Sequence, residues 1–175
     1  MRVTSTTRNR LLAGLIDLGL ALAWALLVAG VGVPLYLTGQ TKALGPLALN
    51  LVGLALVVLP VTVALTVMEC GRYEATPGKL KLGLRVRLEP TGERINWQRS
   101  LLRNLLKLGV PWSLGHLAAI ALAAGGGIDA QIGAILSMAV PISYLVTLFV
   151  GDGRTVYDRL AGTMVISTQP GRRFA

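Results

Sequence analysis

Four long stretches without a single charged residue constrain this chain more than any other feature. They cover residues 18–41, 43–68, 108–128 and 130–151. Each exceeds about 20 residues, the length that an α-helix needs to cross a hydrocarbon core of about 30 Å. Because lipid offers no partner to backbone N–H and C=O groups, such stretches must be helical unless they form a barrel. They lack the alternating ten-residue pattern of barrel strands, so we expect four membrane-spanning helices in two hairpins.

The composition agrees with a polytopic, all-α membrane protein. Only 14% of the residues are charged, whereas a soluble domain carries roughly 25%. A cleaved signal peptide is not expected, because the first apolar run is too long for one and contains Asp17. We expect one membrane domain over residues 1–175. Its predicted parts are helices over about 11–37, 44–68, 106–124 and 130–150, a cytoplasmic segment 69–105 and a cytoplasmic tail 151–175.

The 17 basic residues are distributed very unevenly. Three precede the first run, nine lie between the second and third, and four follow the fourth, whereas Lys42 alone lies between the first and second. The positive-inside rule therefore predicts a plasma-membrane (inner-membrane) protein with both termini and the central segment in the cytoplasm. We expect the basic surface to meet anionic lipid headgroups. A nucleic-acid partner is not expected, because interleaved aromatic residues are missing.

The central segment contains a strand pattern. Residues 79–88 alternate strictly between basic or small residues and apolar ones, which is typical of a strand. The turn residues Pro90-Thr91-Gly92 follow, and a return through Arg94 and Ile95 would close a small cytoplasmic hairpin.

An amphipathic helix is predicted after this hairpin. Asn96 can cap a helix that starts at Trp97. Arg99, Arg103 and Lys107 follow at four-residue spacing and form a basic stripe. We expect this helix to lie at the membrane interface, with its basic stripe on the headgroups.

The two halves of the chain resemble each other. Pro60, Thr62 and Thr66 match Pro141, Ser143 and Thr147 in spacing, and Thr76, Gly83 and Val86 match Thr155, Gly162 and Val165. A parallel repeat about an axis along the membrane normal would explain this. Strands near 84–88 and 164–168 would then pair beneath the bilayer. The alternative is chance matching among residues that are common in membrane proteins.

Asp17 is a candidate functional residue because it lies inside the first span. A charge at the bilayer centre costs roughly 2.5–3.5 kcal/mol on insertion scales, so it normally finds a partner within the protein. Arg10, Arg103, Arg154 or a water could serve. Two interpretations remain open: a structural ion pair, or the handling of protons or ions.

His116 and Asp158 are further candidates. His116 lies beside a stripe of small residues in the third span, which suggests a tight helix contact, and it is either hydrogen-bonded across that contact or part of a proton relay. Thr155 and Asp158 form a capping-box pattern, and Asp158 could also pair with Arg10 or Lys79.

These motifs, in this order, resemble those of the RDD family, named for one arginine and two aspartates. Arg10 through Asp17 is similar to the opening motif, and Thr76-Pro77-Gly78-Lys79 through Gly83-Leu84-Arg85-Val86 is similar to the central motif, with Pro77 where a leucine is usual. Arg103-Asn104 resembles the second arginine region. Asp158-Arg159-Leu160-Ala161-Gly162-Thr163 resembles the closing motif. The three name-giving residues would be Arg10, Asp17 and Asp158.

The resemblance implies a small multi-spanning membrane protein, and some family members are reported as cation–proton antiporters. We therefore expect transport of a small cation or of protons by a homo-oligomer. Its ion-handling candidates are Asp17, His116, Arg10, Asp158 and Arg103, and its cytoplasmic motif comprises Gly78, Lys79, Gly83 and Arg85. The alternative is a non-catalytic scaffold or regulatory subunit that binds a membrane-protein partner or anionic lipid. We expect no enzyme, metal or cofactor, since no metal-ligand or nucleophile spacing is present.

Overall fold

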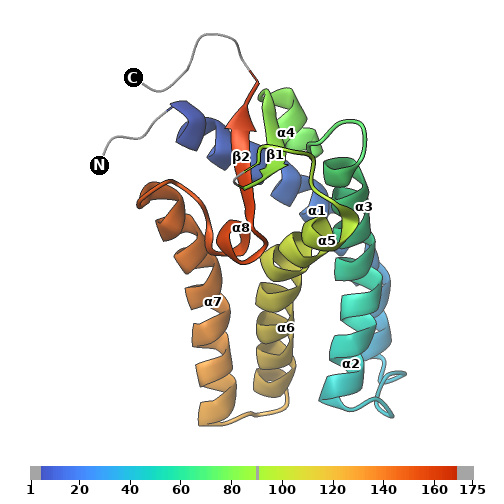
Figure 1. The fold of residues 1–175 in the computed structure, drawn as a ribbon. Coiled ribbons are helices and arrows are strands. Elements are labelled where there is room, and N and C mark those ends of the chain that lie inside the picture. The colour runs from blue at the N-terminus through green and yellow to red at the C-terminus, as the bar shows by residue number, and fades with distance from the viewer. Residues whose placement is uncertain (1–4, 90, 169–175) are drawn as a thin grey trace.

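The computed structural model describes residues 5–89 and 91–168, and it confirms a mostly helical chain with four long apolar helices and a small sheet (Figure 1). Three of the basic residues that were counted for the positive-inside rule, Arg2, Arg172 and Arg173, lie outside the described residues. We call each long, continuous run of helix a rod. The first rod is α1 (Ser5–Leu37) and the fourth is α7 (Ile128–Phe149). The second rod consists of α2 (Pro46–Gly53), η1 (Leu54–Val58) and α3 (Leu59–Cys70), and the third of α5 (Trp97–Asn104), η2 (Leu105–Gly109) and α6 (Val110–Ala123).

The first rod begins earlier than predicted. It starts at Ser5 rather than near residue 11 and contains 33 residues, which corresponds to about 50 Å of helix. That length exceeds the roughly 30 Å of a hydrocarbon core. Its first turns therefore extend beyond the apolar layer and bring Arg10 to the polar groups at that end.

The two π-helical segments, η1 and η2, each precede a proline, Pro60 and Pro111. A proline inside a helix lacks an N–H and clashes with the carbonyl four residues earlier. Side chains from other rods bind the carbonyls released in these wider turns. Trp24 Nε1 donates to the oxygen of Leu56 at 2.9 Å, and the Tyr144 hydroxyl donates to the oxygen of Leu106 at 2.8 Å. Each proline thus creates a hydrogen bond between rods.

Most of the surface of the rods is apolar and is not covered by the protein itself. Between 6 and 28% of the residues in the most apolar part of each span are buried. Leucine, isoleucine and valine side chains dominate the exposed remainder. This is the arrangement expected where lipid acts as the solvent. The well-buried polar side chains instead concentrate at one end of the bundle.

That end, which we call the polar end, contains α4 (Pro77–Lys81), β1 (Leu84–Leu88), α8 (Val156–Leu160) and β2 (Thr163–Ser167). The start of α1 lies at the same end, and the connections 38–45 and 124–127 lie at the opposite end (Figure 1). The predicted separation of the basic segments from the two short loops is therefore present in the fold.

The predicted pairing between the two halves is confirmed. Strands β1 and β2 are antiparallel, with Leu84 opposite Ser167 and Val86 opposite Val165. The expected return through Arg94 is confirmed in part: an antiparallel bridge joins Arg87 to Arg94 and the N–H of Leu88 donates to the carbonyl of Glu93, but the described residues form no strand there. The sheet is therefore formed by segments from opposite halves of the chain.

The prediction of a strand from residue 79 is wrong for its first part. Residues Pro77–Lys81 form α4, because Pro77 stands at the first helical position, where its fixed φ favours a helix and its missing N–H costs nothing. The strand begins only after Gly83, whose φ of 63° an L-residue rarely adopts.

The repeat is visible around this sheet. Each half contains a five-residue helix, a glycine with φ near 62° at Gly83 or Gly162, and a five-residue strand. Val86 pairs with Val165, its own equivalent in the other half. Contact of equivalent residues across a pair is the property of a two-fold axis. This supports the predicted repeat for these segments.

The predicted interfacial helix is wrong in two respects. It is continuous with the third span through η2. Two members of its basic stripe, Arg103 and Lys107, also turn inward, whereas Arg99 is exposed. The reason is electrostatic: Glu69 on α3 and Asp158 on α8 lie beside the stripe and form ion pairs with Arg103.

Candidate functional site

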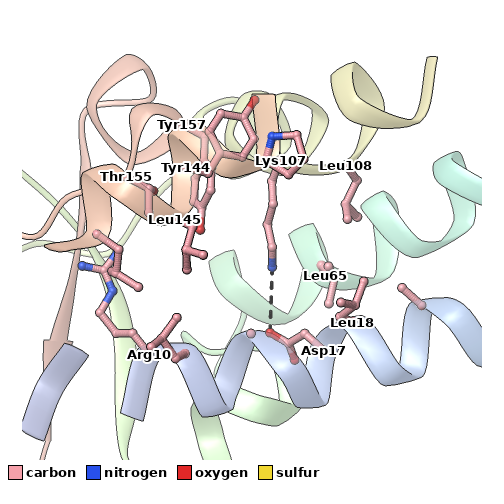
Figure 2. A pocket seen from close by; sticks show the side chains of 15 residues that line it. Arg10, Asp17, Leu18, Leu65, Lys107, Leu108, Tyr144, Leu145, Thr155 and Tyr157 are labelled. Atoms are coloured by element: carbon pink, nitrogen blue, oxygen red, sulfur yellow. Dashed lines mark ion pairs between the residues drawn. The ribbon is translucent and has the colours of Figure 1, made fainter. Parts of the chain in front are cut away.

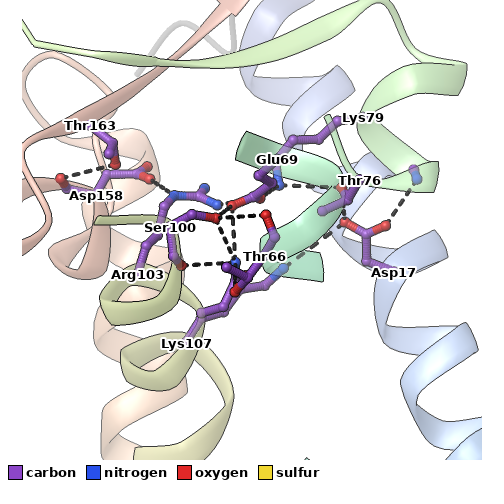
Figure 3. A network of polar contacts seen from close by, with 12 residues as sticks. Asp17, Thr66, Glu69, Thr76, Lys79, Ser100, Arg103, Lys107, Asp158 and Thr163 are labelled. Atoms are coloured by element: carbon purple, nitrogen blue, oxygen red, sulfur yellow. Dashed lines mark hydrogen bonds and ion pairs between the residues drawn. The ribbon is translucent and has the colours of Figure 1, made fainter. Parts of the chain in front are cut away.

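Glu69, at the last turn of α3, is the centre of the polar end (Figure 3). Its side chain is fully buried. Lys79 Nζ donates to its Oε1 at 2.7 Å and Arg103 Nη1 at 2.5 Å. On Oε2 it accepts from Asn104 Nδ2 at 3.0 Å and Ser100 Oγ at 3.3 Å. Both oxygens of this carboxylate are therefore occupied.

Asp158, on α8, forms the second centre. Arg103 Nε donates to its Oδ1 at 2.8 Å, and Arg10 Nη2 donates to its Oδ2 at 2.5 Å. The backbone N–H of Thr155 also donates to Oδ2 at 3.3 Å, as the capping box predicts. Arg10 additionally donates to the carbonyl of Gly153. Burial raises the pKa of Asp158, but the two guanidinium groups outweigh it and hold the pKa below its ordinary value.

The sequence analysis gave Arg10 and Lys79 as possible partners of Asp158. Lys79 instead pairs with Glu69. Its ammonium also donates to Thr76 Oγ1 at 3.3 Å. Burial lowers the pKa of Lys79 below its ordinary value, although the Glu69 carboxylate opposes that shift.

Asp17 forms its hydrogen bonds with the start of α4, and its contact with the nearest basic side chain, Lys107, is longer. The carboxylate is 4% exposed and accepts from the Thr76 hydroxyl at 2.5 Å and from the backbone N–H of Gly78 at 2.9 Å. It thereby satisfies one of the free N–H groups of the first turn. Gly78 lies so close to α1 that a Cβ would approach the carbonyl oxygen of Ala13 to 2.1 Å. The contact therefore requires glycine at this position.

None of the predicted basic partners of Asp17 is the observed one. Lys107 Nζ lies 4.0 Å from Asp17 Oδ2, whereas Arg10 and Arg103 are occupied by Asp158, and Arg154 pairs with Glu89 and Asp152. Lys107 was predicted as part of the interfacial stripe and not as part of this site.

These side chains form one connected group, which we call the polar core. It comprises Arg10, Asp17, Glu69, Lys79, Arg103, Lys107 and Asp158. Thr76 connects Asp17 to Lys79, and Arg103 connects Glu69 to Asp158. Four cations against three carboxylates leave one positive charge unbalanced. Removing one partner of a buried pair typically costs about 3–5 kcal/mol, because the other charge stays behind uncompensated.

A cavity of about 240 Å³ adjoins the polar core (Figure 2). Residues of α1 and α7 form its sides, and Leu65 of α3 and Lys107 of η2 also line it. Asp17 and Lys107 point toward each other in it, and Arg10 and Tyr157 lie at its polar side.

His116 does not reach the polar core. It lies nine residues beyond Lys107 on the same rod, about 13 Å along the axis. Its Nδ1 lies 3.2 Å from Asn50 Oδ1, and its ring stacks on Trp112. His116 therefore contacts another helix by a hydrogen bond, but that helix is α2, whereas Gly115 of the small-residue stripe faces Ser137 of α7. Gly53, on the facing rod, leaves room for the imidazole, since a Cβ there would lie 3.0 Å from its ring.

Gly83 and Arg85 of the cytoplasmic motif lie outside the polar core as well. Arg85 pairs with Glu74 at 3.3 Å, and Arg87 and Arg94 pair with the same carboxylate. Glu74 itself is buried and has a φ of 54°, which is uncommon for a non-glycine residue. Three arginines around one carboxylate form a basic surface beside the sheet.

The sequence interpretation missed Glu69, Ser100 and Thr66 as members of this end. One signal could have identified Glu69, because the chain contains only eight acidic residues and this one directly follows the apolar run that ends at Met68. Within residues 5–89 and 91–168, no three His, Cys, Asp or Glu side chains gather into a group that could hold a metal ion.

Four apolar rods and a buried network of ion pairs at one end define a polytopic membrane protein whose polar core joins both halves of the chain. The chain belongs to the RDD family, whose model matches residues 4–162. Neither the curated proteins nor the solved structures gave a match to the chain. Of the three name-giving residues, Arg10 and Asp158 contact each other, and Asp17 joins them through the polar core.

Proposed function

We propose that this RDD family protein is a non-catalytic scaffold or regulatory subunit of the membrane. The observation that carries the proposal is the state of Asp17, whose two oxygens are occupied by Thr76 and Gly78 in a site that is 4% exposed. An ion-binding carboxylate must exchange its partners during turnover. Asp17 instead holds α4 against α1. The oxygens of Glu69 and Asp158 are occupied as well, those of Glu69 by two cations and two neutral donors and those of Asp158 by two guanidinium groups.

The scaffold would present the basic surface around Glu74 at the cytoplasmic face. The side chain of Arg94 is 61% exposed and that of Arg85 is 47% exposed. Basic residues near an anionic leaflet contribute about 1 kcal/mol each to attraction. We place the polar end in the cytoplasm on the positive-inside rule. The uncovered apolar faces of the rods would meet lipid, a second copy or another membrane protein.

Reconstitution into proteoliposomes tests this function. The purified protein should give no pH change when a Na⁺ or K⁺ gradient is imposed, and it should co-purify from its native membrane with a stoichiometric membrane-protein partner. A cation-driven pH change in the wild type that Asp17→Asn abolishes would overturn the proposal. Asp129→Asn is the matched control, since Asp129 is an exposed carboxylate at the opposite end of the bundle.

A second candidate function, transport of protons or a small cation, is favoured by one observation. Asp17 and Lys107 point toward each other in the cavity at 4.0 Å, beyond hydrogen-bond distance. A proton or a water-bound cation entering there would meet a carboxylate and an amine. The flux described above, lost in Asp17→Asn and kept in Asp129→Asn, is the result that this candidate requires.

A further inference from the structure

The cavity beside the polar core has two chemically different sides. Its polar lining comprises the cations Arg10 and Lys107, the hydroxyl of Thr155 and the Asp17 carboxylate, whose two oxygens already accept from Thr76 and Gly78. Its remaining walls are largely aliphatic, and they include Leu18 of α1 and Leu145 of α7. These two leucines are each 49% exposed. The cavity therefore opens between two spans, toward the region that lipid chains occupy around the rods.

The polar side of this cavity can accept an anion. The polar core has one more cation than carboxylates. Lys107 is the cation with the loosest pairing, since the structure of residues 5–89 and 91–168 gives it only the 4.0 Å contact with Asp17. The buried hydroxyl of Thr155 accepts from the backbone N–H of Asp158 in the capping box, but it donates to no acceptor among the described residues. An oxyanion would supply a charge-assisted hydrogen-bond acceptor to these groups.

The size of the cavity limits what it can hold. Its volume of about 240 Å³ equals roughly eight water molecules at about 30 Å³ each. A phosphate with the adjoining glycerol carbons is of this order, whereas the acyl chains would have to leave between α1 and α7. The exposed Leu18 and Leu145 would then contact the chains as they leave.

We infer that the cavity binds one anionic phospholipid, with its phosphate at Lys107 and its acyl chains passing between α1 and α7. The inference rests on the proposed function, because it names the ligand class of a lipid-binding subunit. Free phosphate would satisfy the cation but would leave the aliphatic walls unfilled, so the lipid is the better complement to the whole cavity.

Lipid binding by the full chain tests the inference. Protein delipidated in detergent is titrated with phosphatidylglycerol, phosphatidylcholine and inorganic phosphate, and bound lipid is counted by native mass spectrometry. We expect one phosphatidylglycerol per chain and no comparable binding of phosphatidylcholine. Lys107→Gln should weaken phosphatidylglycerol binding about tenfold, the loss expected for one charge-assisted contact. Lys81→Gln, at an exposed lysine of α4, should not change it.

A second variant keeps the test sharp if Lys107→Gln fails to fold. Leu18→Trp fills the open side of the cavity from an exposed position and leaves every charge in place. It should also reduce lipid binding. Equal binding of both lipids, binding of phosphate alone, or full binding by both variants would overturn the inference. The flux and co-purification experiments are independent of this readout, so failure here leaves the scaffold function standing.

Discussion

Gly78 is the residue at which α1 and α4 approach most closely. The backbone N–H of this glycine donates to Asp17, and its α-carbon faces the backbone carbonyl of Ala13. Both groups belong to the backbone, so neither can rotate away from an added methyl group. The residue therefore sets how closely α4 approaches the first span.

Gly78→Ala should destabilise the protein by about 2 kcal/mol or more, the range of overpacking in a tight contact. The measurement is the midpoint of thermal unfolding in detergent. Gly19→Ala is the control, because Gly19 is helical on α1 and has nothing within 4 Å of an added Cβ. Equal midpoints for the two variants would contradict the close approach.

Asp158→Asn should destabilise the protein by about 3–5 kcal/mol at neutral pH, since Arg10 and Arg103 then lose their shared carboxylate. The pKa of Asp158 is lowered in the folded state, so its contribution is present above the unfolded pKa of about 4 and is lost as pH falls through the lower folded value. The difference between wild type and variant, followed by urea unfolding in detergent, should therefore persist at pH 5 and shrink well below pH 4. A difference that vanishes already at pH 6 would exclude this ion pair as its source.

For single residues, the sequence predicts which charged side chains belong to the site better than it predicts which partner each one binds. Arg10, Asp17 and Asp158 were identified as candidates, and Arg10 with Asp158 was one of the predicted pairs. Asp17 was assigned to the wrong partners, because many arginines and lysines at one end of the chain are equivalent in a linear pattern. Its hydrogen-bond partners are the Thr76 hydroxyl and the Gly78 N–H, 59 and 61 residues along the chain, and their positions depend on how α4 folds back onto α1.

Among the elements, the pairing of β1 with β2 joins the two halves of the chain. The backbone N–H of Val86 donates to Glu74 and not to Val165. Val86 and Val165 therefore form a non-hydrogen-bonded pair, the type with side chains closest together, at about 4.5 Å between α-carbons. That distance lies within the range that a disulfide can bridge.

Val86→Cys with Val165→Cys, in a Cys70→Ser background, should form an intramolecular disulfide on mild oxidation. The measurement is the increased mobility of the non-reduced band in gel electrophoresis. Arg85→Cys with Val165→Cys is the matched control, because a shift of one residue places the two side chains on opposite faces of the sheet. Efficient cross-linking of the control pair would show a different register.

The type of each element, helix or strand, could be predicted from a long apolar run. The prediction failed for short segments, where alternation was the only signal. Residues 79–81 belong to the alternating pattern 79–88, but Pro77 starts a helix that includes them, and the strand begins only after Gly83. The face of α5 was also reversed. Amphipathicity says that a basic stripe exists, and only the carboxylates of neighbouring elements decide that Arg103 turns inward.

The whole molecule separates an apolar bundle from one polar end, and this separation predicts its orientation. In a Cys70→Ser background, Ala43→Cys on the α1–α2 connection should react with a membrane-impermeant maleimide added to intact cells. Thr91→Cys at the polar end should react only after the membrane is permeabilised. Labelling of Thr91→Cys in intact cells would place the polar end outside and would remove the basis of the proposed cytoplasmic surface.

The two-fold relation around the sheet matches a position in one half of the chain to a position in the other, and the two side chains there carry opposite charges. Lys79 and Asp158 occupy matched places on α4 and α8, yet the first binds Glu69 and the second binds two arginines. Two identical half-length chains joined through the same strand edge would carry the same residue at both places, either two ammonium groups or two carboxylates. In a single chain the two matched places need not carry the same residue, and here each complements the charge of a different neighbour.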